Sequence, residues 1–284
     1  MALSARIPVG LDDNAFIPKI YSMNVLMAVK HQLVALPFVN HSFESELVKG
    51  DILYIPKTNT VTATEVTIGT EGVIKNPFNT DEASVTINQY YEAPVVVDYM
   101  SRRQSQVDLV GKAAIESAYA VSKQMDTSVC ALFASLSDAT GYGTDGSAVT
   151  DDVLIDCVEE LDNADIPAEN RAWIGDPSVK ADLMTIDKFV RADYFASDAI
   201  PTGGFRKDIY GAPFLITNNL AVGTTGNVGA YLHRDAIAAI VSENLGVDRV
   251  EQPLKHQITI NTTALWGVAE IQDDWGCPLL TRLA

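Results

Sequence analysis

The stretch from Gln104 to Leu136, QSQVDLVGKAAIESAYAVSKQMDTSVCALFASL, decides the fold because its pattern predicts one unusually long helix. Its apolar residues recur at spacings of three, four or seven and so share one helix face: Val110, Ala114, Val121, Met125, Val129, Leu132 and Leu136. At 1.5 Å per residue the helix would be about 45 Å long, roughly three times the usual globular length. Ser105 or Asp108 is suited to cap its start. A coiled-coil strand is the competing interpretation, which the lack of flanking charges disfavours.

The residues before this helix predict an extended β-ribbon, from about residue 50 to residue 98. Runs rich in β-branched and aromatic residues occupy 52–55, 61–68 and 85–97, as is typical of half-buried strands. An isolated two-stranded ribbon is marginally stable in water. We therefore expect this ribbon to bury its apolar side on a neighbouring copy of the chain. The alternative is an ordinary ribbon that lies on its own globular body.

The remaining segments predict an arm and a mixed α/β region. Residues 1–45 contain three prolines around a short helix and are interpreted as the arm. The glycine-rich loop 141–146 follows the long helix and is interpreted as a hinge between two lobes. After it we expect a helix opened by Thr150 or Asp151, a buried strand at 171–174, a short helix after Asp176-Pro177, a turn and strand at 209–216, a strand at 229–241, and tail strands at 257–265 and 268–271. The tail strands are expected to pair with each other and to pack on the long helix.

Composition places this chain of 284 residues among folded globular proteins. Hydrophobic residues make up 47% of it, and no stretch approaches the ~18 apolar residues that a membrane-spanning helix needs. The first ten residues, MALSARIPVG, lack the apolar core of a secretory signal. Three cysteines lie far apart in the sequence, which favours buried thiols in a reducing cytosol over a disulfide framework.

The net charge of −17 is unevenly distributed. Residues 151–200 hold 13 acidic and 4 basic side chains, whereas residues 1–50 hold four of each sign. Binding to phosphates needs clustered Lys and Arg, and no such cluster occurs. Sequence-specific nucleic-acid recognition is therefore not expected, although this balance is compatible with a protein that lines a compartment of packed nucleic acid.

No motif predicts a catalytic, metal-binding or cofactor-binding site. Gly141–Gly146 matches G-x-G-x-x-G, but a dinucleotide site needs a strand before the motif and a helix at its end. A Walker loop and a G-x-S-x-G elbow are both absent, and the four histidines lack metal-ligand spacing. Asp151 and Asp152 suit a helix N-terminus, while Asp138 and Asp145 do not match a calcium loop. We therefore expect no enzyme activity.

The order of these parts, over essentially the whole chain, resembles the major capsid proteins of tailed phages, which share the HK97 fold. The segment Arg171-Ala-Trp-Ile-Gly-Asp-Pro177 before a short helix, and the run from Gly203 to Asn218, are similar to recurring segments of that family. The resemblance implies an α+β fold with four parts: an N-terminal arm (1–45), an extended β-hairpin or E-loop (46–98), a P domain with the spine helix (99–149 and 247–284), and an α/β A domain (150–246).

The resemblance also implies a function. Many copies, as hexamers and pentamers, would close into an icosahedral head around double-stranded DNA in the virion, after assembly in the host cytoplasm. Neither sequence-specific DNA binding nor a membrane is involved. Separate scaffolding, portal and decoration proteins are the partners that the resemblance suggests; the chain starts almost directly with its arm, so any scaffold is expected to be another protein. The alternatives are an encapsulin-like nanocompartment shell, which encloses a cargo enzyme, and an enzyme with an embellished α/β core.

Five ribbon residues are candidate intersubunit contacts: Lys57, Lys75, Phe78, Tyr90 and Tyr91. Exposed aromatic residues on a ribbon mark an interface. In family members that crosslink covalently, a lysine on the E-loop faces an asparagine and a catalytic acid. Lys57 and Lys75 supply a ribbon lysine, but we expect no crosslinking.

Overall fold

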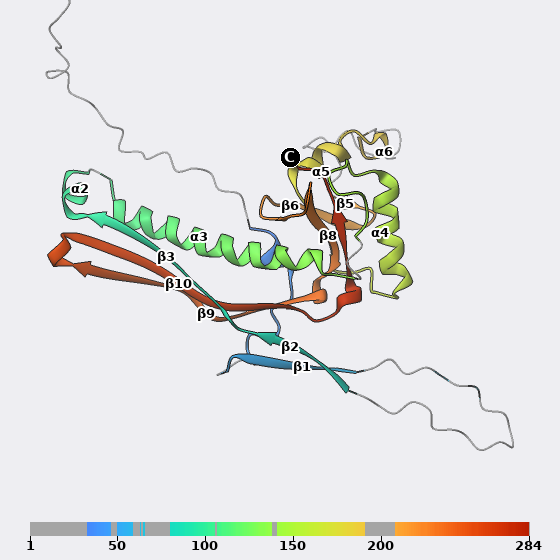
Figure 1. The fold of residues 1–284 in the computed structure, drawn as a ribbon, viewed down its shortest axis with the longest axis horizontal. Helices are drawn as coiled ribbons and strands as arrows, with labels where there is room; N and C mark the ends of the chain where they lie inside the picture. Colours follow the sequence, from blue (N-terminus) through green and yellow to red (C-terminus); the bar gives the residue numbers. More distant parts are fainter. Residues whose placement is uncertain are drawn as a thin grey trace, which may run out of the picture.

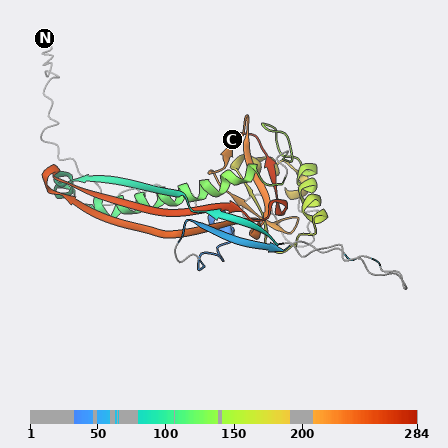
Figure 2. The same cartoon turned by 60° about the horizontal axis from the view of Figure 1, so that its bottom comes forward.

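The computed structural model of the chain describes residues 33–46, 50–58, 63, 65, 80–105, 107–137, 141–190 and 208–283. These residues form three parts (Figure 1): a long arm in which one helix lies along a three-stranded sheet, a globular end built on a six-stranded sheet, and a two-stranded ribbon near their junction. This long arm is a different part from the predicted N-terminal arm of residues 1–45, most of which lies outside the described residues. Turned about its long axis, the arm is a thin layer of one helix over one sheet (Figure 2). Helices and strands are therefore mixed, in agreement with the predicted α+β class.

Three antiparallel strands form the sheet of the arm, in the order β3 (Gln89–Asp98), β10 (Gln257–Glu270) and β9 (Ile237–Gln252). Helix α3 (Leu109–Ala131) packs on one face of this sheet. Side chains alternate across a strand, so every second residue of β10 points to the helix. The buried contacts are Ala113, Val121 and Met125 of α3 with Ile258, Ile260, Ala264 and Trp266 of β10. The predicted apolar stripe of the long helix thus faces a sheet.

The long helix is shorter than predicted because a break divides the segment 104–136. Helix α2 (Tyr99–Gln104) ends at Ser105, whose extended backbone (ψ 134°) interrupts the helical path. The Asp108 side chain accepts a hydrogen bond from Gly111 N (3.1 Å), so α3 begins at the next residue. Of the two suggested caps, Asp108 is therefore the one that caps α3. The 23 residues of this helix span about 35 Å.

The ribbon consists of β1 (Ile52–Thr58) and β2 (Thr80–Thr86), which pair antiparallel with Thr58 opposite Thr80. The prediction that its second strand continues to residue 97 is wrong. Residues 89–98 leave the ribbon and pair as β3 with β10 in the arm. The other strand predicted for the ribbon, residues 61–68, lies largely outside the described residues.

The base of the ribbon packs on its own subunit. Its buried apolar side chains contact residues of the same chain: Ile55, Val85 and Ile87 pack with Ala238 and Ile240 of β9 and with Ile271, which follows β10. A Cβ on Gly267 would lie 2.4 Å from Thr86 O, so glycine is needed where β10 meets β2. The expectation that the ribbon buries its apolar side on a neighbouring copy is therefore wrong for this base. The alternative, a ribbon that lies on its own body, holds there.

The globular end is built on a sheet whose strand order is β11 (Gly276–Leu280), β8 (Asn227–His233), β4 (Arg171–Gly175), β6 (Ala212–Ile216) and β5 (Asp208–Ile209), with β7 (Ala221–Val222) also paired to β8. Helices α4 (Asp151–Asn163), α5 (Pro177–Leu183) and α6 (Asp187–Val190) accompany it. The predicted helix after Thr150, the strand at 171–174, the helix after Asp176-Pro177 and the turn and strand at 209–216 are confirmed. Asp176 caps α5 by accepting from Val179 N (3.0 Å).

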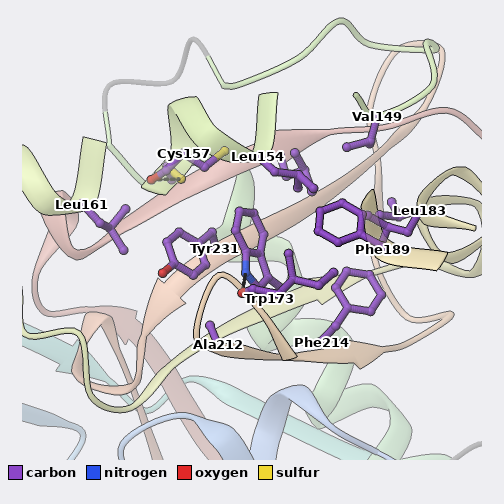
Figure 3. Packing of buried hydrophobic residues seen from close by; sticks show 14 of the residues in the cluster. Val149, Leu154, Cys157, Leu161, Trp173, Leu183, Phe189, Ala212, Phe214 and Tyr231 are labelled. Carbon is purple, nitrogen blue, oxygen red and sulfur yellow. Dashed lines mark hydrogen bonds between the residues drawn. The ribbon is translucent and has the colours of Figure 1, made fainter. Parts of the chain in front are cut away.

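A stacked aromatic pair lies at the centre of this end (Figure 3). The ring centroids of Trp173 and Tyr231 are 4.0 Å apart with 19° between the ring planes. The indole Nε1 of Trp173 donates a hydrogen bond to Ile209 O (3.2 Å), which satisfies the buried polar atom. Leu154 and Cys157 of α4 belong to the same buried cluster, so the apolar face of α4 is fixed to the sheet.

Two predictions for the C-terminal strands are wrong. The segment 229–241 is not one strand, because β8 ends at His233 and, after the 3-10 turn η4 (Arg234–Ala236), the chain enters the arm as β9. The tail strands predicted at 257–265 and 268–271 are one continuous strand, β10, which pairs with β3 and β9. The last strand, β11, joins the globular sheet beside β8. The hydrogen bonds of a sheet join residues that are far apart in sequence. The alternation of apolar and polar residues within one strand therefore did not reveal which strands pair with β10 and β11.

A buried carboxylate joins three segments of the chain. Oδ1 of Asp126, on α3, accepts hydrogen bonds from Ala35 N (3.0 Å) and Leu36 N (2.9 Å) at the start of the short helix α1 (Ala35–Phe38). Its Oδ2 accepts a hydrogen bond from Asn219 Nδ2 (2.8 Å) in the globular end. Asp126 is fully buried, so these donors replace the water that a carboxylate would otherwise bind.

Candidate intersubunit surfaces

The three predicted contact residues that the structure describes lie in two different parts of the subunit. Lys57 lies half-buried in β1, opposite Asp81 of β2. Lys75 and Phe78 lie outside the described residues. Tyr90 and Tyr91 belong to β3 in the arm, so the prediction that they lie on the ribbon is wrong.

Tyr90 and Tyr91 are nevertheless exposed, at 59% and 43% of their full surface. The Tyr91 ring stacks on Trp266, with ring centroids 5.1 Å apart and 24° between the ring planes. Both tyrosines line a concavity of about 570 Å³ together with Gln124 and Ser128 of α3. Its lining contains two tyrosines and no charged residue, and the cores of protein interfaces are likewise enriched in aromatic and depleted of charged residues.

A larger groove, of about 860 Å³, lies between the ribbon base and the junction of the two sheets. We call it the basal groove. Its apolar lining comes from Phe43, Ile55, Ile271 and Trp275. Its charged lining consists of Asp81, Asp235, Asp274 and Lys57, so carboxylates exceed cations. Of the predicted contact residues, Lys57 therefore belongs to a concave and mainly acidic surface.

Neighbouring groups hold the inner wall of this groove. Asp235 Oδ1 accepts a hydrogen bond from Asn40 Nδ2 (2.7 Å), and its Oδ2 lies 3.8 Å from His233 Nδ1. The His233 ring meets Trp275 edge-on, with centroids 4.9 Å apart. Burial lowers the pKa of His233 below its usual value because it disfavours the charged imidazolium; nearby Asp235 opposes this shift and Arg171 adds to it.

Exposed apolar residues gather at the far end of the arm. Met100 in α2 is 62% exposed, and Leu254 in the turn η5 (Pro253–Lys255) is 98% exposed. Val96 and Val250 are about half exposed on β3 and β9. Sequence reasoning missed these residues. A leucine beside proline and lysine in a turn was the one available signal, since an apolar side chain at a turn has no neighbouring core to enter.

The described residues contain no group of three or more His, Cys, Asp or Glu side chains that could hold a metal ion. Cys130, Cys157 and Cys277 are buried. Burial strongly raises the pKa of Cys130, and the hydrogen bond with the Cys277 side chain, followed by burial, strongly raises the pKa of Cys157. This is the opposite of what a nucleophilic cysteine requires.

The glycine loop 141–146 does not have the surroundings of a nucleotide site. Its Tyr142 N donates to Pro278 O (2.8 Å), and Tyr142 O accepts from Leu280 N (2.8 Å). The loop is thus fastened to β11, and the Tyr142 hydroxyl donates to Glu160 Oε2 of α4 (2.9 Å). The interpretation of this loop as a hinge between two lobes stays a prediction. Among the described residues, no helix has both the length and the apolar character needed to cross a bilayer.

Comparison with known proteins gives a match in structure but not in sequence. No protein-family model and no curated protein matches the chain. A chain in a structure of Mycobacterium phage Che8 matches with a TM-score of 0.79 and 20% identity, over 93% of this chain and 97% of that chain. A chain of the cyanophage P-SCSP1u capsid matches with a TM-score of 0.74 and 14% identity, over 95% and 94%. The fold is a phage capsid fold.

A capsid chain of a native GTA particle matches in the same way, with a TM-score of 0.70 and 12% identity, over 98% of this chain and 100% of that chain. Each match covers nearly the full length of both chains. The capsid fold therefore includes the arm and the globular end together. At 12% to 20% identity, the shared property is the arrangement of the backbone.

Proposed function

We propose that the chain is the major capsid protein of a tailed double-stranded DNA phage and assembles with copies of itself into an icosahedral shell. The observation that carries this proposal is the match to the Che8 phage chain over 93% of this chain and 97% of that one. The P-SCSP1u and GTA matches are capsid structures, and they support the same role.

The shape and surface of the subunit support the same proposal. A thin arm with exposed apolar residues at its far end is suited to contact other copies, because large exposed apolar groups mark interaction sites. We assign the arm with α3 to the P domain, the globular end to the A domain and the ribbon to the E-loop. Copies would form hexamers and pentamers in the virion, with assembly in the host cytoplasm and DNA enclosed without sequence-specific contacts.

The test is to express the full chain and to examine it by size-exclusion chromatography and electron microscopy. Closed shells, or rings of five or six subunits, are the expected result. A strictly monomeric protein at high concentration overturns the proposal. Shells purified from cells with an enclosed enzyme in place of DNA favour a nanocompartment.

A further inference from the structure

The basal groove carries unmatched negative charge beside apolar walls. Three carboxylates face one lysine: Asp81, Asp235 and Asp274 with Lys57. The Asp274 side chain is exposed and makes no hydrogen bond or ion pair within the part of the chain that the structure describes. Phe43 and Trp275 supply apolar surface next to these acids. A partner with cationic side chains around an apolar group would match both features.

The far end of the arm has such a composition. We call α2 together with η5 the distal tip. It presents Met100 and Leu254 at 62% and 98% exposure. The cations Arg102, Arg103 and Lys255 surround them in sequence and, within the described residues, have no ion-pair partner. The two arginines are exposed, as is Lys255.

One copy cannot bring its own tip to its own groove. Figure 1 shows α2 at one end of the arm, whereas β1 and β2 lie below its other half, toward the globular end, and α3 runs along the arm from α2 toward that end. The 23 residues of α3 hold the two ends about 35 Å apart. The helix is packed on three strands along its length, so the arm does not bend back. The complementary surfaces can therefore meet only between two copies.

We infer that the distal tip of one copy docks into the basal groove of a second copy. Leu254 and Met100 contact the apolar wall of the groove, while Arg102, Arg103 and Lys255 face its three carboxylates. This contact uses different surfaces on the two partners, so it leaves a free tip and a free groove for further copies. The inference rests on the proposed function and specifies which surfaces assemble.

A disulfide test between two single variants examines this contact directly. Full-length Leu254→Cys and Asp274→Cys proteins are mixed under assembly conditions and oxidised with copper phenanthroline. A disulfide-linked dimer that forms only in the mixture is the expected result. The three native cysteines are buried and give little background. Leu254→Cys mixed with Asp152→Cys, an exposed position on α4, is the matched control and should give none.

The outcomes separate this inference from the proposed function. Shells that form without a 254–274 disulfide overturn the inference and leave the function standing. Dimers that form in Leu254→Cys alone show a contact between two tips and also overturn it. The disulfide in soluble oligomers that never close into shells supports the contact and counts against the capsid role.

A charge exchange provides a second measurement. Lys255→Glu and Asp274→Lys should each raise the protein concentration needed for assembly at least tenfold. The double variant Lys255→Glu/Asp274→Lys should recover most of this loss, because the opposed charges are restored in exchanged positions. Lys123→Glu, exposed on α3, is the control and should have little effect. A double variant as defective as the two single changes combined overturns the pairing.

Discussion

The carboxylate of Asp126 accepts a hydrogen bond from the side-chain amide of Asn219 at 2.8 Å, and this contact joins α3 to the globular end. The same carboxylate holds the backbone of Ala35 and Leu36. All these partners come from segments about 90 or more residues away in sequence. One buried side chain thus fixes three separate parts of the subunit relative to one another.

Asp126→Ala should lower the free energy of unfolding by about 2–4 kcal/mol, because it leaves buried N–H donors without acceptors. Urea denaturation followed by circular dichroism measures the loss. Lys123→Ala, exposed on the same helix, should change stability by less than about 0.5 kcal/mol. Equal effects of the two substitutions would contradict the role of Asp126.

Val121→Asp should prevent folding, or reduce stability by more than about 4 kcal/mol, since it places an unpaired carboxylate between α3 and β10. Val121 is 3% exposed, whereas Ile115 on the same helix is 55% exposed. Ile115→Asp should therefore give a soluble protein with nearly unchanged thermal stability. Comparison of soluble yield and melting temperature for the two variants tests the orientation of α3.

All three cysteines should be unreactive in the native subunit. All three are buried. The pKa of Cys130, through burial, and that of Cys157, through its hydrogen bond with Cys277 and through burial, lie far above the usual thiol value, which suppresses the reactive thiolate. Titration with Ellman's reagent at pH 8 should detect almost no thiol in native protein and all three in denaturant. Rapid labelling of one thiol in the native protein would contradict the prediction, because it would mean that the reagent reaches that cysteine.

Acidification should destabilise the subunit through His233. Its folded pKa lies below the ordinary 6.5, so the unfolded chain binds the proton more readily than the native state. The contribution of neutral His233 to the free energy of unfolding is therefore complete above pH 6.5. It is lost as the pH falls below 6.5, because the unfolded chain then takes up the proton first. His233→Asn should show a smaller loss of urea midpoint between pH 7 and pH 5 than the native chain. His41→Asn, at a more exposed histidine, should retain the full loss.

The far part of the ribbon should be dispensable for folding but required for assembly. Replacing residues 59–79 with an Asn-Gly turn joins Thr58 to Thr80, which already face each other across the ribbon. The variant should keep the native circular dichroism spectrum and melt within a few degrees of the intact chain. Electron microscopy should show no closed shells.

A milder variant, Lys75→Ala/Phe78→Ala, tests the two predicted contact residues within that segment. It should reduce the yield of shells without changing the melting temperature. Normal shells from both variants would show that the far part of the ribbon is not required for assembly.

Local features of the fold were predictable from sequence wherever the cause was local. Asp108 and Asp176 cap helices because an acid or amide side chain can reach N–H groups only two or three residues ahead. The buried strand that contains Trp173 was recognised from its composition and the Asp-Pro stop after it. Ser105 was an equally good cap by composition, and only the observed backbone distinguished it from Asp108.

The candidate contact surfaces were less predictable. Tyr90 and Tyr91 were predicted as intersubunit contacts on the ribbon; they are exposed, but they belong to β3 in the arm. The basal groove combines Phe43, Lys57 and Asp274 from three distant segments, and no sequence pattern connects them.

By itself, the sequence determined the order of the parts, the helical stripe that contains Val121, and the absence of a recognisable catalytic motif. These follow from side-chain periodicity and from hydrogen bonds within a few residues. Only the tertiary structure decided that β3 leaves the ribbon for β10, that β11 joins β8, and that Leu254 is exposed on the surface of the subunit. Periodicity specifies which face of a strand is apolar, whereas the partner of that face depends on backbone pairing between residues far apart in the chain.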